Sequence, residues 1–219
     1  MSDIFQEVDE ELKRQHMDKA LKTYGPIAVG AVLVILGGVA SFNFWQGYQE
    51  RQADAAGNQL IQGMEFLALG QQDLAAAVFA GLGDSAPEGY ALLARFHEAA
   101  ALRQSGDTAS ALSLYDEISE NSATDQEFRD LARFYSGLAA LGNSASTFED
   151  IELRLAPVAE GAGPWRFHAA EALAYAAFRD NRFEDAATRY AALTDDPATP
   201  AGIAARATEM LNLTEAAAE

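Results

Sequence analysis

The segment GDTASALSLYDEI, from Gly106 to Ile118, decides the fold of this chain because two similar segments flank it. These are GQQDLAAAVFAGL, from Gly70 to Leu82, and NRFEDAATRYAAL, from Asn181 to Leu193. Each starts at a turn residue and has an alanine five positions later, an aromatic residue four positions after the alanine, and an aliphatic residue three positions after that. The residues that follow this rule are Ala75, Phe79 and Leu82; Ala111, Tyr115 and Ile118; and Ala186, Tyr190 and Leu193. Three copies of one pattern predict a repeat protein.

The spacing of the three copies predicts a further unit. Their alanines lie 36 and 75 positions apart, which is about one and two repeat lengths. A weaker unit is therefore expected between the second and third copies. It would comprise Leu131–Gly142 and then Phe148, Ile151, Leu155 and Val158, which keep helical spacing but lack the alanine and the aromatic residue.

A small residue stands twelve positions before each alanine of the pattern, and these residues are Gly63, Ala99 and Ala174. Small residues that face each other let two antiparallel helices approach closely, so each unit is predicted to be a helical hairpin. The pattern resembles the tetratricopeptide repeat, a helical hairpin of about 34 residues. An alanine-rich helical array without true repeats is the alternative interpretation.

The composition after residue 50 favours an all-α fold. Valine and isoleucine together number only six in residues 50–219. Strands favour β-branched residues, whereas the alanine and leucine that dominate here favour helices. Ile203, Ala207, Met210 and Leu211 share one helical face and predict a capping helix at the C-terminal end of the array. The expected fold is an α-solenoid of tetratricopeptide-like hairpins.

A long uncharged stretch precedes the repeats. Residues 23–49 contain no Asp, Glu, Lys or Arg, and the 20 residues from Pro26 to Trp45 would form a helix about 30 Å long. We therefore predict a transmembrane helix over residues 24–48, with Tyr24, Trp45 and Tyr48 at the membrane interfaces. A cleavable signal peptide and a buried soluble helix are the competing interpretations.

The flanking charges orient the predicted span. Lys13, Arg14, Lys19 and Lys22 precede it, and Arg51 is the basic residue close behind it. The positive-inside rule places the leader, residues 1–22, in the cytoplasm and residues 50–219 on the far side of the membrane. The leader is expected to be a short helix that either stays solvated or docks on a membrane partner. Gly37 and Ser41 form a small-xxx-small pair, so pairing of spans into a homo-oligomer stays open.

The whole layout resembles the YfgM family of bacterial inner-membrane proteins. The resemblance rests on the leader, the span and the degenerate repeats. It also rests on the exit from the span, FWQGYQE (Phe44–Glu50), and on the opening of the second repeat, GYALLARFHEAA (Gly89–Ala100). It implies an inner-membrane protein whose C-terminal domain is periplasmic. It further implies an ancillary subunit of the SecYEG translocon that works beside a PpiD-like periplasmic chaperone.

Charge and composition exclude several classes of function. The 219 residues carry 33 acidic and 15 basic side chains, a net charge of −18, which excludes nucleic-acid binding through a general basic surface. The absence of cysteine excludes disulfide frameworks and cysteine-ligated metals. There is no phosphate-binding loop, HExxH motif or nucleophile elbow, so we expect neither an enzyme nor a cofactor. His168 and Glu171 form at most a weak two-ligand metal pair.

The first helices of a repeat array line a concave surface, and this surface is the predicted binding groove. Its candidate residues are Phe96, Arg103, His168, Glu171, Tyr175 and Arg179, with Met64 and Leu67 in the first unit. The alternative is that several of these side chains belong to the core. Trp165 has the same two interpretations, with packing favoured. A partner surface for so acidic a domain should be basic or neutral.

The predicted function is therefore that of a membrane-anchored periplasmic adaptor or co-chaperone at the Sec translocon. An envelope scaffold for cell division or cell-wall assembly would use the same fold and topology.

Overall fold

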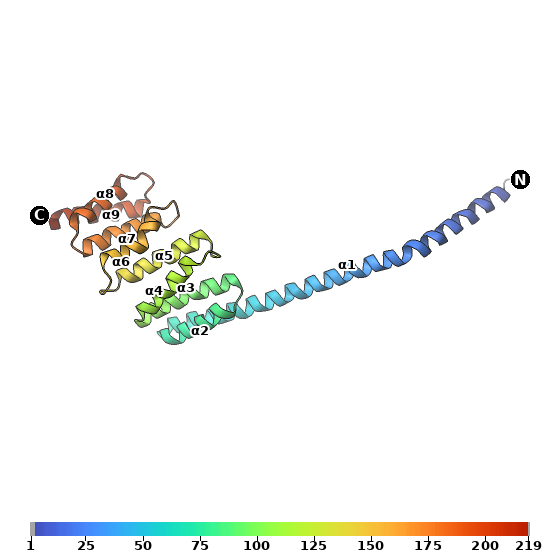
Figure 1. Cartoon of the computed structure of the whole chain (residues 1–219), viewed down its shortest axis with the longest axis horizontal. Coiled ribbons are helices and arrows are strands. Elements are labelled where there is room, and N and C mark those ends of the chain that lie inside the picture. The colour runs from blue at the N-terminus through green and yellow to red at the C-terminus, as the bar shows by residue number, and fades with distance from the viewer. Residues whose placement is uncertain (1–2, 219) are drawn as a thin grey trace. The chain divides into compact units, whose positions relative to one another are not determined.

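The computed structural model describes residues 3–218, and the side chains of residues 35–218. Every element in this part is a helix (Figure 1). The helices are α1 (Asp3–Ala68), α2 (Gln72–Ser85), α3 (Glu88–Ser105), α4 (Thr108–Glu120), α5 (Gln126–Leu141), α6 (Phe148–Ala159), α7 (Arg166–Arg179), α8 (Phe183–Asp195) and α9 (Ala201–Ala218). The chain divides into two compact units, Met1–Asp54 and Ala55–Glu219, and the second holds the repeats.

Short turns close the three predicted hairpins, which are the end of α1 with α2, α3 with α4, and α7 with α8. The turn residues that open the three sequence copies, Gly70, Gly106 and Asn181, have positive φ angles of 71°, 98° and 60°. Glycine reaches this left-handed region without strain, and asparagine tolerates it better than most residues. The recurring turn residue therefore marks the reversal of each hairpin.

The pattern residues form the core, as predicted. Ala75, Ala99, Ala111, Ala174 and Ala186 are all fully buried, and the three aromatic residues of the pattern are at most 3% exposed. A Cβ atom added at Gly63 would overlap the ring of Phe79. The small residue of the first helix thus makes room for the aromatic residue of the second helix, which is why the two positions recur together.

The predicted weak unit is the hairpin of α5 and α6. Here Gly137 is the small residue, because a Cβ atom at this position would overlap the side chain of Leu155. Ile151, Leu155 and Val158 take the places of the alanine, the aromatic and the aliphatic residue, and all three are buried. The turn between the helices runs from Gly142 to Thr147, so it is longer than in the other hairpins. The longer turn shifts the register, and the signature is missing because Ile151 and Leu155 replace the alanine and the aromatic residue.

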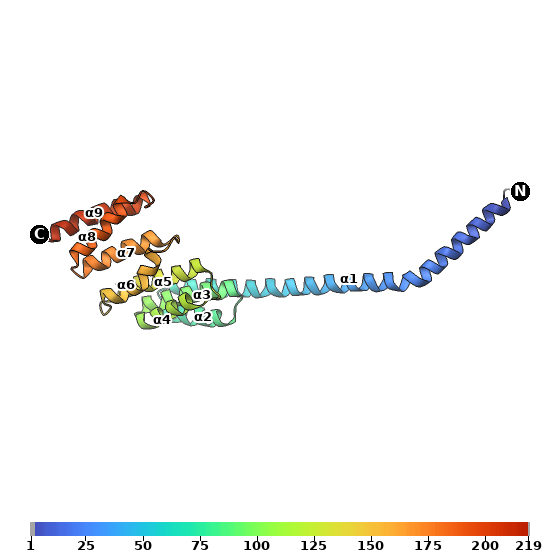
Figure 2. The ribbon, with the colours of Figure 1, turned by 45° about the horizontal axis from the view of Figure 1, so that its top comes forward.

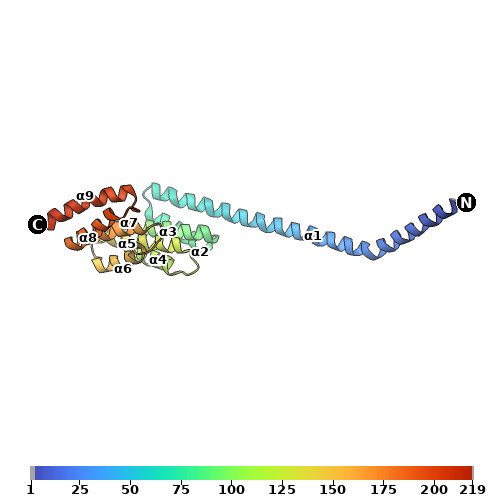
Figure 3. The ribbon, with the colours of Figure 1, turned by 90° about the horizontal axis from the view of Figure 1, so that it is seen from above.

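The odd-numbered helices form one layer of the repeat unit. Helix α7 packs against both α5 and α9, in addition to the contacts that each helix makes with its neighbours along the chain. Figures 2 and 3 show the hairpins of α3 to α8 following one another, with α9 at the C-terminal end. Ile203 and Ala207 of α9 are buried, and Met210 and Leu211 pack against the same cluster. Helix α9 is therefore the predicted cap.

A search of the described residues finds no helix that is both long enough and apolar enough to cross a membrane. The predicted span begins before the region in which side chains are described. Tyr24, the leader and most of the first half of the span lie outside that region. Trp45 and Tyr48 lie within it, and both are exposed on α1.

Candidate partner-binding face

The four small residues Gly63, Ala99, Gly137 and Ala174 define equivalent positions on the first helices. The small residue of each first helix faces the second helix of its hairpin. The positions on the other side of the first helix are those six before, two before and one after the small residue. Six large apolar side chains stand exposed at these positions, each between 36% and 57% accessible. They are Ile61 and Met64 on α1, Leu93 on α3, Tyr135 and Leu138 on α5, and Tyr175 on α7, and we call them the apolar strip.

The second helices expose far fewer large apolar side chains. Among the described residues of α2, α4, α6 and α8, Leu74 and Leu153 are the two that are exposed. A row of apolar groups that recurs on successive first helices has the character of an interaction surface, whereas isolated exposed leucines are ordinary.

A chain of aromatic rings supports the middle of the strip. Phe96 of α3 contacts Tyr115 and Tyr135, with both centroid distances 6.2 Å. The rings of Tyr115 and Tyr135 stack at 5.8 Å, which joins α4 to α5. Tyr115 is only 3% exposed, and burial raises the pKa of its phenol to about 12. Rings that contact on several sides have few alternative rotamers, so Tyr135 is held in a fixed position.

The same array continues toward α7. Phe134 stacks on Trp165 with an interplanar angle of 10°, and both rings contact His168 at 6.2 and 6.3 Å. The indole N–H of Trp165 is buried without a hydrogen-bond partner among the described atoms. Trp165 therefore packs between helices, as favoured from the sequence, and it carries the exposed His168 beside the strip.

The predicted groove residues divide into two groups. Phe96 is partly buried in the aromatic array, while Arg103, His168 and Tyr175 are exposed on their first helices. Of the two first-unit candidates, Met64 belongs to the strip, and Leu67 packs against the core cluster of α1, α2 and α3.

Two other groove candidates connect elements within the array. Glu171 accepts two hydrogen bonds from Arg206 of α9, at 2.6 and 2.7 Å. Arg179 donates to the carbonyl oxygen of Leu141, at 2.6 Å, and to that of Ser146, at 3.1 Å. It thereby satisfies acceptors at the end of α5 and in the following turn. Both side chains already hold neighbouring first helices together, so their polar atoms are less free for a partner.

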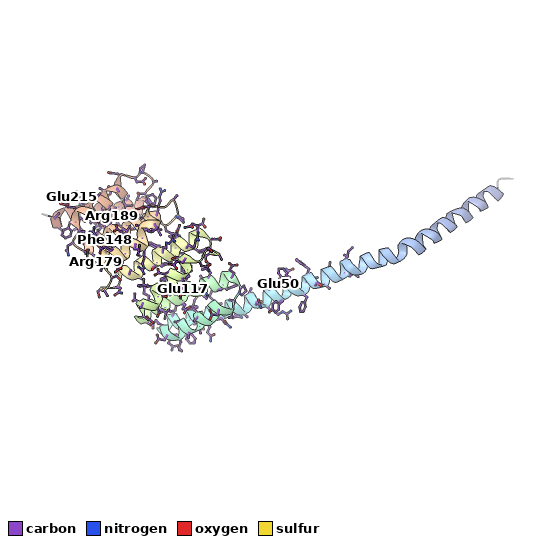
Figure 4. All side chains as sticks on the ribbon, viewed as in Figure 1. Glu50, Glu117, Phe148, Arg179, Arg189 and Glu215 are labelled. Atoms are coloured by element: carbon purple, nitrogen blue, oxygen red, sulfur yellow. The ribbon has the colours of Figure 1, made fainter. Side chains whose placement is uncertain are left out.

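Ion pairs between successive second helices were not foreseen from the sequence. Arg154 of α6 donates to the hydroxyl of Ser136 and to Asp116 of α4, and Ser136 donates to the same carboxylate, all within 2.9 Å. Arg189 of α8 likewise pairs with Glu152 of α6 at 2.7 Å. Figure 4 labels Arg189, Phe148 and Arg179, and the guanidinium of Arg189 lies over the ring of Phe148 at 5.6 Å. The sequence feature that could have predicted these ion pairs is an acidic residue followed by an arginine about one repeat length later.

The strip residues on α5 were also missed, because the register of that unit was not visible without Gly137. Among the described residues, no group of three metal-ligating side chains gathers in one place. His97 stacks on Phe79 at a centroid distance of 5.2 Å, and burial lowers the pKa of its imidazole.

Comparison with known proteins gives one match. A family model described as a tetratricopeptide repeat-like domain matches residues 3–160, which ends at the close of α6. No curated protein and no solved structure matches the chain. The hairpin of α7 and α8 repeats the same arrangement of small and aromatic residues beyond the matched range.

Proposed function

This chain belongs to the family of tetratricopeptide repeat-like domains, and we propose that it is a non-catalytic adaptor that binds proteins through the apolar strip. The observation that carries this proposal is the recurrence of exposed apolar side chains at equivalent positions on α1, α3, α5 and α7. Concave layers of first helices are the usual binding surfaces of such arrays.

The energetics of the strip suit a protein partner. Complete burial of one large apolar side chain contributes about 1.5–3 kcal/mol, so covering the remaining exposed half of six such groups contributes several kcal/mol in total. Association costs a comparable amount in lost freedom of motion. The strip by itself therefore supports a moderate affinity, which suits an adaptor that releases its partner.

The proposal includes a membrane anchor over residues 24–48. Its support is the uncharged sequence from residue 23 to residue 49 and the basic residues that precede it. In the described part of this segment Ile35, Phe42 and Phe44 are each at least 60% exposed, which is costly in water and favourable in lipid. The basic flank favours a cytoplasmic leader and a repeat domain on the far side of the membrane, which is the periplasm if the resemblance to the YfgM family holds.

The proposed place of action is the SecYEG translocon, together with a PpiD-like chaperone in the bacterial inner membrane. The support for this finer statement is the resemblance of the layout to the YfgM family. An adaptor that stands at the exit of a secretion channel would meet extended apolar segments, which is the kind of ligand that the strip suits.

Affinity purification from membranes tests the proposal. The full chain is compared with a strip variant, Met64→Ser/Tyr135→Ser/Tyr175→Ser, and with a matched control on the second helices, Leu74→Ser/Leu153→Ser. We expect secretion components with the wild type and the control, and a strong loss with the strip variant. Cell-wall synthases in place of secretion components would favour the scaffold alternative, and equal recovery by all three proteins would contradict the adaptor proposal.

A further inference from the structure

Two adjoining hollows lie along α3 on the side where α2 and α4 face each other. Their volumes are about 500 Å³ and about 370 Å³, and they share Gly83 and Arg95. The first hollow has apolar walls that include Leu92, Ile118 and the exposed ring of Phe128. We call the two hollows together the α2–α4 groove. Arg95, Glu98 and Leu102, which line the second hollow, lie on the opposite side of α3 from Leu93, so this part of the groove is separate from the apolar strip.

The register of the repeats explains why this groove is open. The gap between α4 and α6 is the next one along the array. There, Asp116 of α4, Ser136 of α5 and Arg154 of α6 form a closed set of hydrogen bonds. Counted from the small and aromatic positions of each unit, the equivalent residues of the α2–α4 gap are Ala80, Glu98 and Leu114, and all three line the second hollow.

The second hollow therefore has Leu114 at the position of the cation Arg154, while acidic groups line the same hollow. Asp84, Glu98 and Glu117 line it, with Arg95 as the basic residue. Among the described side chains Arg95 has no carboxylate within 4.0 Å, so it forms no close pair with any of the three. Burial raises the pKa of the Glu98 carboxyl; Asp84 and Glu117 raise it further, and Arg95 offsets part of the increase. An additional cation would be favourable here.

Gly83 keeps space for this arrangement. A Cβ atom at this position would lie 3.2 Å from the Cγ atom of Arg95, which is tighter than most Cβ contacts in proteins, so the arginine would have to shift. The bare backbone of α2 thus lets Arg95 lie across the groove at the boundary between its apolar part and its acidic part.

We propose that the α2–α4 groove binds a segment of a partner protein that places a lysine or arginine against Glu98 and an apolar side chain beside Phe128. The incoming cation occupies the place that the guanidinium of Arg154 fills in the next gap. Charge complementarity identifies the occupant, because the second hollow presents three carboxylates beside the apolar wall residues of the first hollow. This site extends the proposed function and does not depend on the apolar strip.

A peptide selection tests the proposal. A phage library of random 12-residue peptides is first depleted on the full-length Leu114→Arg variant in detergent micelles and then selected on the wild type. In the variant the new arginine lies where Arg154 lies in the next gap, so it should pair with Glu98 and Glu117 and fill the groove. We expect the remaining peptides to carry a lysine or arginine next to an apolar residue.

Synthetic versions of these peptides measure the charge contribution. Replacement of the key arginine by citrulline, which has nearly the same shape and no charge, should weaken binding about tenfold or more, as for one lost charge-assisted hydrogen bond. Glu98→Gln should weaken binding in the same direction, and Leu114→Gln, the uncharged comparison for the depletion variant, should weaken binding much less than Leu114→Arg does. A raised unfolding midpoint for Leu114→Arg would confirm that its arginine pairs inside the groove.

The proposal is overturned if no basic peptide survives depletion, or if citrulline peptides bind as well as their arginine parents. Because the apolar strip is intact in every one of these variants, failure here is distinguishable from failure of the adaptor proposal.

Discussion

The first helices and the second helices of this array differ in how they use their exposed sides. The first helices present apolar groups that recur from unit to unit, from Ile61 to Tyr175. The second helices are joined from α4 to α8 by Arg154 and Arg189, which pair with acids on the preceding second helix. Ion pairs of the second-helix layer therefore join successive repeats, whereas the first-helix layer also presents the apolar strip to a partner.

Both layers depend on the close packing inside each hairpin, and the core provides the largest expected effect. Leu155 is fully buried against Gly137. Leu155→Ala should lower the free energy of unfolding by about 2–5 kcal/mol, because it removes buried contacts and leaves a cavity. Urea denaturation followed by circular dichroism measures this loss. A change below about 1 kcal/mol would show that the α5–α6 hairpin is not tightly packed.

The cohesion of the second helices is tested at Arg154. Arg154→Met keeps much of the side-chain volume but leaves the fully buried Ser136 with one hydrogen bond fewer. We expect a loss of about 1–3 kcal/mol in unfolding free energy, because the buried hydroxyl oxygen of Ser136 loses the donor Arg154 and keeps only its bond to Asp116. Arg206→Met breaks a more exposed pair, with Glu171, and should cost less. Equal losses for the two variants would contradict the expectation that the more buried Arg154 network contributes more to stability than the exposed Arg206–Glu171 pair.

The open gap between α2 and α4 gives the smallest effect, and it depends on pH. A carboxyl whose pKa is raised by folding stabilises the folded state fully below its unfolded pKa of about 4.3, and this contribution is lost as pH rises through the folded pKa. Because burial raises the pKa of Glu98, Glu98→Gln should be the more stable protein at pH 7. The advantage should shrink as pH falls toward 4. Thermal midpoints of both proteins across this range measure it, and a destabilised variant at pH 7 would refute the account of the groove.

Much of the repeat fold was predictable from the sequence because single residues carried the signal. Gly70, Gly106 and Asn181 marked the hairpin turns, and the alanine–aromatic spacing marked the packing between helices. The α5–α6 hairpin was predicted to exist, but its register was not, because Leu155 replaces an aromatic residue and the turn after Leu141 is longer.

The candidate site was predictable only in part. Tyr175 and Met64 were found by counting along the first helices, and both are exposed in the strip. Tyr135 was missed because its position depends on Gly137. Arg179 and Glu171 were expected to face a partner, yet their hydrogen bonds run to Leu141, Ser146 and Arg206. Hydrogen-bond partners that lie one repeat length away in the sequence can be predicted only when the register of every unit is known.

Site-specific photo-crosslinking in membranes tests the central claim most directly. p-Benzoylphenylalanine replaces Tyr135 on the strip in one protein and Leu153 on the second-helix layer in another, since both residues are exposed. The account predicts discrete protein adducts from position 135, with a translocon or chaperone component among them, and few from position 153. Adducts of equal yield from both positions, or none from position 135, would contradict it.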